Sequence, residues 1–313
     1  MNITKEDITF DSRDGKTVLH ASVWKPEGDI KAIVQIVHGM NEYIDRYDRF
    51  ARHLAEQGYY VTGEDHLGHG KSVPEGGLFG YFAAHDPATV IVRDVHRLKK
   101  LTQEKLGEDI PYYILGHSMG SIMLRNYLLR YGKGIDGALI LGTGTPKPSF
   151  LAGGQIMTKT IAAIKGDTYV SQKLAALTFK DYMEHIEQPR TFYDWVTSDP
   201  EELEKYVKDP WCAGFTFTVN GFYTLAEMSR RMQIKKLMER IPKKLPILIM
   251  SGMEDPVGHW GKDPQELYDT YINMDMSKVA IKLYPGMRHE ILNEVNREKV
   301  FEDIENWLAQ HIY

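Results

Sequence analysis

The alternation of short apolar runs with helical patterns over residues 1–145 constrains the fold more than any other feature of this sequence. Ala32–Val37 is short and rich in β-branched residues, as a buried parallel strand is, whereas Arg46–Gln57 has apolar residues at helical spacing. Similar patterns predict strands at Thr17–Trp24, Tyr59–Gly63, Tyr112–Leu115 and Gly137–Leu141, and helices at Ala88–Leu106 and Met119–Tyr131. This order predicts βαβ units, and therefore an α/β fold with a mostly parallel sheet flanked by helices.

Strand patterns are almost absent from about residue 145 to residue 240. This segment instead has helix-like patterns at 155–164, 171–186, 201–207 and 220–240, separated by Pro189, Pro200 and Pro210. Strands then follow at Pro246–Ser251 and Val279–Tyr284, and helices at Pro264–Met274 and Arg297–His311. We therefore expect an α/β core formed by residues 1–145 and 241–313. A helical cap at 146–240 would be inserted at the carboxyl ends of the strands, where open α/β sheets bind ligands.

The composition excludes several classes of protein. The chain has 313 residues, of which 42% are hydrophobic and 26% are charged, which is typical of globular rather than disordered, collagenous or membrane-spanning proteins. The net charge of −5 and the lack of a Lys/Arg run disfavour nucleic-acid binding. Cys212 is the only cysteine, so no intrachain disulfide can form. The polar start lacks the apolar region of a secretory signal, so we expect a cytoplasmic protein without a transmembrane segment.

The pentapeptide Gly116-His117-Ser118-Met119-Gly120 matches G-x-S-x-G and lies between a predicted strand and a predicted helix. A strand–turn–helix of this kind places the central serine on a strained, exposed turn, and the flanking glycines leave room for the backbone. A glycine-rich turn without chemistry is the alternative. Because a serine hydroxyl is a weak nucleophile, a catalytic Ser118 also needs a base, and an acid that orients the base.

Two later strand ends carry residues that this chemistry requires. Asp255 and His289 each follow one of the last two predicted strands, which gives the chain order Ser, Asp, His. Glu254 is a rival acid, but Pro256 favours an extended turn directly after Asp255. We therefore expect a catalytic triad of Ser118, Asp255 and His289.

The other histidines are weaker candidates for the base. His259 lies four residues after Asp255 in a predicted loop, and His117 is next to the nucleophile, where neighbouring side chains are expected to point elsewhere. Three further histidines lie in glycine-rich loops before Ser118, and we expect them to hydrogen-bond within those loops: His38, His66 and His69. No H-x-E-x-H motif or Cys/His cluster supports a metal site.

Acyl transfer also needs hydrogen-bond donors for the developing oxyanion, each worth about 3–4 kcal/mol. One donor is typically the backbone N–H of the residue after the nucleophile, here Met119. The other would come from the loop at 38–42, where Gly39 permits a tight turn and Met40 presents its N–H. An ordinary glycine turn is the alternative for this loop.

Several motifs together carry a family resemblance: His38-Gly-Met-Asn-Glu42 with Arg46-Tyr47, Asp65-His-Leu-Gly-His-Gly-Lys-Ser72, Gly116-His-Ser-Met-Gly120, Asp255-Pro-Val and His289. With them the chain resembles the monoacylglycerol lipase/lysophospholipase-like α/β-hydrolases of bacterial type, the group also labelled serine aminopeptidase S33 or Hydrolase_4. The resemblance implies an α/β-hydrolase fold with an inserted cap, and a serine esterase that uses no cofactor. It implies Ser118, Asp255 and His289 as the triad, and the N–H groups of Met40 and Met119 as oxyanion donors.

The predicted cap is rich in aromatic residues and methionine, most of which should pack the cap onto the core. Amphipathic helices over an apolar slot would also shield an acyl chain from water. Candidate substrate contacts are Phe150 and Phe179 in the cap and Met287 beside His289. Related enzymes often have a small residue at the position of Met40, so its bulky side chain would narrow an acyl pocket.

Three functions are compatible with these residues. The first is hydrolysis of carboxylic esters of the monoacylglycerol or lysophospholipid type through an acyl-enzyme. The second is an aminopeptidase of the prolyl-iminopeptidase kind, which also needs a buried carboxylate for the substrate amine; the cap offers Glu184, Glu187, Asp194 and Asp199. The third is a non-catalytic ligand-binding protein, which an intact Ser/Asp/His set disfavours. Ser118 argues against dehalogenases and epoxide hydrolases, which have aspartate at this turn.

Overall fold

The computed structural model describes residues 3–312, and within them it contains one eight-stranded sheet with the strand order β1-β2-β4-β3-β5-β6-β7-β8. The strands are β1 (Thr4–Asp11), β2 (Val18–Lys25), β3 (Ala32–Val37), β4 (Tyr59–Glu64), β5 (Tyr112–His117), β6 (Gly137–Leu141), β7 (Ile247–Gly252) and β8 (Val279–Tyr284). β1 and β2 pair antiparallel to their neighbours, whereas all pairs from β4 to β8 are parallel. The predicted α/β fold with a mostly parallel sheet is therefore confirmed.

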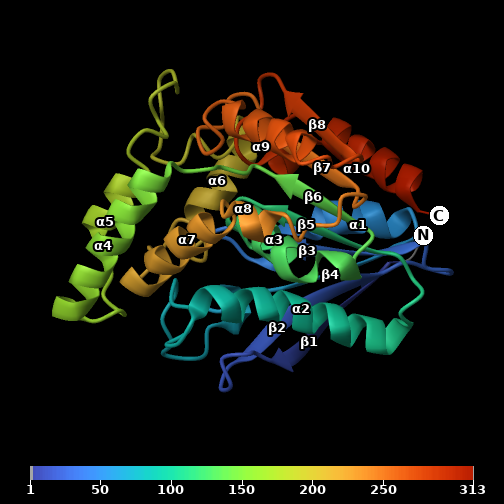
Figure 1. The fold of residues 1–313 in the computed structure, drawn as a ribbon, viewed down its shortest axis with the longest axis horizontal. Coiled ribbons are helices and arrows are strands. Elements are labelled where there is room, and N and C mark those ends of the chain that lie inside the picture. The colour runs from blue at the N-terminus through green and yellow to red at the C-terminus, as the bar shows by residue number, and fades with distance from the viewer. Residues whose placement is uncertain (1–2, 313) are drawn as a thin grey trace.

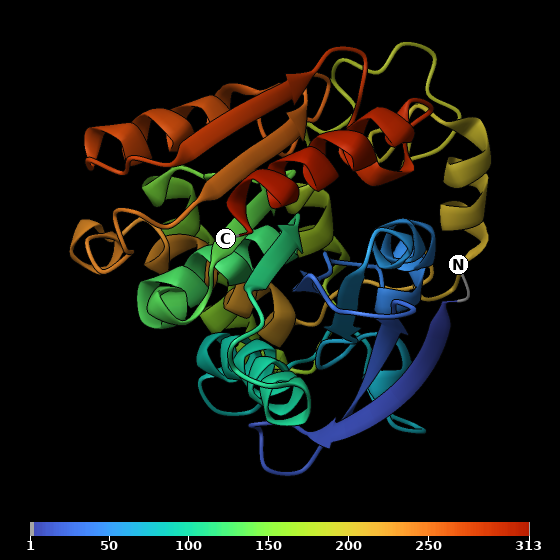
Figure 2. The same ribbon diagram turned by 90° about the vertical axis from the view of Figure 1, so that its right-hand side faces the viewer.

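Helices cover both faces of this sheet (Figures 1 and 2). They are α1 (Asp48–Glu56), α2 (Pro87–Leu106), α3 (Met119–Tyr131), α9 (Lys262–Asn273) and α10 (Arg297–His311), with short 3₁₀ turns at Ile44–Tyr47, Gly70–Ser72, Gly132–Gly134 and Ile291–Asn293. Alternate residues of β3 enter two different cores because side chains alternate along a strand. Ile33 and Val37 pack with residues of α2, α3 and α9, whereas Val34 and Ile36 pack with residues of α1 and α10.

The segment between β6 and β7 contributes no strand to the sheet in the part of the chain that the structure describes. It contains α4 (Pro148–Lys165), α5 (Gln172–Thr178), α6 (Pro200–Lys208), α7 (Val219–Arg231) and α8 (Lys235–Met238), and one isolated bridge between Val170 and Thr218. In Figure 1 α4 and α5 lie at the end of the molecule opposite the two termini. Its division from the core as a cap domain stays a prediction.

Several helix boundaries differ from those that the sequence predicts. The patterns at 171–186 and 220–240 each look like one helix, but the first helix ends at Thr178 and the second separates into α7 and α8. Pro200 begins α6 rather than breaking a helix, because proline fits the first helical turn and Asp199 caps it by accepting from two backbone N–H groups. Likewise α4 begins at Pro148 and not at residue 155.

None of the helices within residues 3–312 is long and apolar enough to cross a membrane.

Candidate active site

Ser118 occupies a sharp turn between β5 and α3, with φ 55° and ψ −120°. A positive φ is strained for a residue with a side chain. The two glycines of the pentapeptide are required by close backbone contacts around this turn. A Cβ atom at Gly116 would lie 2.8 Å from the backbone carbon of Gly120, and one at Gly120 would lie 2.6 Å from the carbonyl oxygen of His38. The local sequence thus folds into the strained turn that the G-x-S-x-G pattern predicts.

Asp255 and His289 meet beyond the carboxyl ends of β7 and β8. His289 Nδ1 lies 3.0 Å from Oδ1 and 2.9 Å from Oδ2 of Asp255, and the Asp255 residue is 0% exposed. The same carboxylate accepts hydrogen bonds from the Ser251 hydroxyl at 3.2 Å and the Val257 N–H at 2.9 Å. The rival acid Glu254 is exposed to solvent. Asp255 thus binds the imidazole through Nδ1, and Nε2 is left to act on another group.

Ser118 and His289 line the same cavity, which has a volume of about 800 Å³. Met40 and Met119 line it as well, so both candidate oxyanion donors belong to residues at this cavity. A Cβ atom at Gly39 would lie only 2.9 Å from Ser118 Cβ, which places the loop at 38–42 directly against the nucleophile candidate. Met119 is the first residue of α3, and the N–H of such a residue has no acceptor within its own helix.

A buried network of charged residues, which the sequence argument missed, lies beside this cavity. Glu42 accepts hydrogen bonds from the Gly39 N–H and from the Tyr47 hydroxyl at 3.0 Å, and its Oε1 lies 3.0 Å from His117 Nδ1. Arg46 bridges this carboxylate at 3.2 Å to Glu290, which it binds through two nitrogens at 2.6 and 2.8 Å. The spacing of Glu42 and Arg46 by four residues was the available sequence signal.

Burial opposes ionisation of Glu42, but the hydrogen bond from His117 and the positive charges of His117 and Arg46 prevail and lower its pKa to about 2. Burial also opposes the charged form of His117, yet its contact with Glu42 raises the pKa of this imidazole above its usual value. The expectation that the His117 side chain points away from the site is wrong. His117 is among the residues that line the cavity, and its ring centroid lies 4.8 Å from that of His289.

The three histidines of the early glycine-rich loops hydrogen-bond to carbonyl groups of these loops, as expected. His38 Nδ1 lies 2.8 Å from the Gly39 carbonyl, His66 Nε2 lies 3.1 Å from the His38 carbonyl, and His69 Nδ1 lies 3.0 Å from the Leu67 carbonyl. Burial and neighbouring histidines lower the pKa of both His38 and His69. His259 pairs with Asp263 at 2.9 Å and does not line the cavity. Within residues 3–312 no group of three or more potential ligands could hold a metal ion.

Helices and loops of the segment between β6 and β7 supply much of the apolar wall of the cavity. The apolar lining residues from the segment between β6 and β7 include Phe150, Leu151 and Met157 of α4, Leu174 and Leu177 of α5, Phe222 and Leu225 of α7, and Phe179, Trp195 and Phe215 of the connecting loops. Two of the three expected substrate contacts, Phe150 and Phe179, are among them. The third, Met287, is not among the lining residues: it is 6% exposed and packs with residues of α10.

The four acidic residues considered for an amine site do not line the cavity. Asp194 accepts hydrogen bonds from the backbone N–H groups of residues 190 and 191, and Asp199 caps α6 and pairs with Arg297 at 3.0 Å. Glu184 and Glu187 are exposed.

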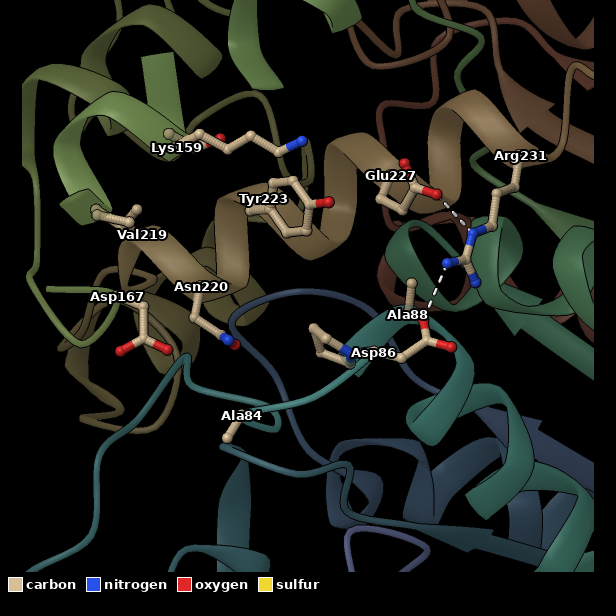
Figure 3. A pocket seen from close by; sticks show the side chains of 13 residues that line it. Ala84, Asp86, Ala88, Lys159, Asp167, Val219, Asn220, Tyr223, Glu227 and Arg231 are labelled. Atoms are coloured by element: carbon tan, nitrogen blue, oxygen red, sulfur yellow. Dashed lines mark hydrogen bonds and ion pairs between the residues drawn. The ribbon is translucent and has the colours of Figure 1, made fainter. Parts of the chain in front are cut away.

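A second, smaller crevice of about 280 Å³ lies between α4, α7 and the start of α2 (Figure 3). Three of its charged groups pair with one another: Arg231 lies 2.7 Å from Glu227 and 2.9 Å from Asp86. None of the predicted catalytic residues lines it. The larger cavity is therefore the candidate active site.

Comparison with known proteins identifies the family and several relatives of the chain. The Hydrolase_4 family model, described as serine aminopeptidase, S33, matches residues 28–296. The chain is 25% identical to a monoacylglycerol lipase of Mycolicibacterium smegmatis over 99% of both chains, and 24% identical to the monoglyceride lipase of Rattus norvegicus over 99% of this chain and 93% of that one. A solved carboxyl esterase from Bacillus coagulans in complex with glycerol superimposes with a TM-score of 0.90, 30% identity and 99% coverage of both chains.

Proposed function

Since the chain belongs to the serine aminopeptidase S33 family and is a serine hydrolase of carboxylic esters with the α/β-hydrolase fold, we propose that Ser118, His289 and Asp255 catalyse this hydrolysis. The observation that carries the proposal is the pair of hydrogen-bond distances between His289 Nδ1 and the fully buried Asp255, on the cavity that Ser118 also lines. Asp255 fixes the tautomer of the imidazole, so that Nε2 serves as the base.

The reaction proceeds through an acyl-enzyme. Ser118 Oγ attacks the ester carbonyl while His289 Nε2 accepts its proton, and the oxyanion forms hydrogen bonds with the N–H groups of Met40 and Met119. The tetrahedral intermediate collapses as the imidazolium protonates the leaving alcohol. Water, deprotonated by the same imidazole, then attacks the acyl-serine and releases the carboxylic acid.

We propose acyl esters of the monoacylglycerol or lysophospholipid type as substrates. The support is the cavity itself, whose wall beyond Ser118 is built from apolar side chains of α4, α5 and α7 and whose volume of about 800 Å³ suits an acyl chain. The residues at 146–240 would act as the cap over this chain. The names of two relatives, a monoacylglycerol lipase and a carboxyl esterase, are consistent with this assignment. A cytoplasmic location stays a prediction from the sequence.

The aminopeptidase alternative finds less support. The acidic side chains that line the cavity are Glu42 and Glu290, and both already bind Arg46 at 3.2 and 2.6 Å. A substrate amine would therefore have to displace a buried guanidinium to find a carboxylate, which is costly in a buried site.

The test is hydrolysis of a monoacylglycerol by purified variants, together with labelling by a fluorophosphonate. Ser118→Ala should lower kcat by roughly 10⁴-fold or more and abolish labelling, and His289→Ala should be nearly as damaging. His259→Ala is the matched control, because this exposed loop histidine also pairs with a carboxylate but lies outside the cavity. Wild-type turnover by Ser118→Ala would refute the mechanism, and a reversed result for the two histidines would refute the choice of base.

A further inference from the structure

The side chain of Asn41 fixes the loop that carries Met40 to the segment between α6 and α7, at the residue directly after Met40. Its amide nitrogen Nδ2 donates hydrogen bonds to the carbonyl oxygens of Cys212, at 3.0 Å, and of Phe215, at 2.7 Å. These acceptors lie more than 170 residues further along the chain, at positions that follow α6. The contact therefore joins the loop beside Ser118 to the cap.

Asn41 has a left-handed backbone conformation with φ 56°. Asparagine adopts this conformation more readily than most residues with a side chain. This backbone turns successive side chains of the loop in opposite directions: Asn41 reaches the cap, whereas Glu42 reaches the core and accepts from the Gly39 N–H. The peptide N–H of Met40 lies between these two attachments.

We propose that Asn41 is a positioning residue, which sets the direction of the Met40 N–H by fastening the oxyanion loop to the cap carbonyls of Cys212 and Phe215. The inference rests on the proposed role of Met40 as an oxyanion donor. An oxyanion donor is effective only when it points at the position that the oxygen occupies in the transition state. Loss of the two hydrogen bonds would leave Tyr43, three residues after Met40, as the next side chain of the loop that hydrogen-bonds to this segment.

The main test compares Asn41→Gly and Asn41→Ala with the wild type. Both variants remove the two donors, but glycine tolerates φ 56° without strain and alanine does not. If the hydrogen bonds position the loop, both variants should lower kcat about 10- to 100-fold, with KM changed by less than about 3-fold, because one lost donor costs roughly 10²–10³-fold. Wild-type kcat in Asn41→Gly would overturn the proposal, whatever Asn41→Ala does.

A second readout reports the oxyanion interaction itself. The ratio of kcat/KM for an ester to that for the matching thionoester, in which sulfur replaces the carbonyl oxygen, measures how well the donors fit an oxygen anion. This ratio should fall about 10-fold in Asn41→Gly. A raised KM with unchanged kcat and ratio would mean that Asn41, which lines the cavity, only binds substrate, and would also overturn the proposal.

Tyr43→Phe is the matched control. The Tyr43 hydroxyl donates to Asp209 at 2.7 Å, so the variant also removes one hydrogen bond between this loop and the same cap segment, but three residues after Met40. It should leave the thionoester ratio within about 2-fold of the wild type, and a loss equal to that of Asn41→Gly would contradict a specific role. Thermal unfolding of each variant separates misfolding from displacement. If Ser118→Ala retains activity the proposed function fails, whereas failure of the Asn41 variants alone leaves that function intact.

Discussion

Asp94 is a buried carboxyl group on α2 that the proposed mechanism does not use. It is 2% exposed and accepts hydrogen bonds from the Ser12 hydroxyl at 2.8 Å and the Arg13 N–H at 2.5 Å. Burial outweighs these hydrogen bonds and, with the nearby charges of Glu64 and Asp14, raises the pKa of Asp94 to about 7. The protein therefore folds around the protonated form of this residue at acidic pH.

This raised pKa makes stability depend on pH. An unfolded aspartate ionises near pH 4, so the stabilisation from protonated Asp94 is present below that pH and is lost as the pH rises to about 7. Ionisation then costs the native state on the order of a few kcal/mol. Asp94→Asn should raise Tm at pH 8 and leave it nearly unchanged at pH 4, as followed by thermal unfolding.

Asp14→Asn is the matched control, because Asp14 lies directly after Ser12 and Arg13, the two residues that donate to Asp94. The pKa of Asp14 is lowered, because hydrogen bonds from Thr17 and Lys16 outweigh its burial. Its contribution therefore has the opposite sign: it is present above pH 4 and lost as the pH falls. A Tm difference between Asp94→Asn and the wild type that does not grow from pH 4 to pH 8 would contradict the assignment.

The sequence predicts the positions of Ser118, Asp255 and His289 because each follows a strand whose pattern is local. It does not predict which way neighbouring side chains turn. Met287 lies two residues before His289, but the loop after β8 turns it into the core. His117 faces His289 because it pairs with Glu42, a residue 75 positions away that no local pattern connects with it.

At the scale of elements, the short segment 194–197 is attached to the loop that carries His289. The carbonyl of Val196 accepts from the Glu290 N–H at 2.8 Å, and Arg288 Nη1 donates to the carbonyls of Asp194 and Thr197 at 2.6 and 3.2 Å. Between these contacts lies Trp195, and the centroid of its ring is 5.2 Å from that of the His289 ring. The segment therefore forms one wall for the imidazole.

Arg288→Met should lower both stability and kcat. It removes two hydrogen bonds from a charged donor, worth about 1.5–3 kcal/mol each, while its side chain keeps a similar length. We expect kcat to fall about 10-fold, because the attachment is next to His289 and small displacements of a base reduce proton transfer. Steady-state kinetics and thermal unfolding of the same preparation provide both values.

Arg297→Met separates these two effects. Arg297 attaches the same segment through Asp199 at 3.0 Å, but from the start of α10. It should lower Tm to a similar extent and leave kcat within about 2-fold of the wild type. If kcat fell equally in both arginine variants, the loss of kcat would follow from the lower stability. The contact of Arg288 would then have no specific effect on His289.

Elements with a strong apolar period can be predicted from the sequence, and those without one cannot. β1 has no predicted counterpart, because it is an edge strand whose residues are mostly exposed or half-buried and therefore lack a buried apolar face. The opposite error occurs at 179–186. Its apolar residues recur at helical spacing, but Phe179, Tyr182, Met183 and Ile186 pack around Trp195 from a series of turns.

At the scale of the whole molecule, the catalytic candidates and the apolar wall come from opposite sides of one cavity. The turns after β3, β5 and β8 supply Met40, Ser118 and His289, and the segment between β6 and β7 supplies the aromatic side chains. The sequence predicts this division, because the carboxyl ends of parallel strands share one edge of the sheet. The size of the cavity depends on how side chains from separate helices meet, and no local pattern determines that.

Acyl-chain length is the property that this arrangement should control. Initial rates on a series of monoacylglycerols should rise with chain length to a maximum at medium or long chains, because each buried CH₂ contributes about 0.8 kcal/mol, or roughly a fourfold gain in kcat/KM. Met40 lies at the reacting end of the cavity and is half-buried, so its side chain limits the width there. Met40→Ala keeps the backbone N–H, and should extend activity towards longer or branched chains without abolishing turnover on short ones.

A maximum at the shortest esters in both proteins would mean that the cap encloses no acyl slot and that the chain is a small-ester hydrolase. A maximum that moves to longer chains only in Met40→Ala would assign the restriction to this one side chain rather than to the cap helices.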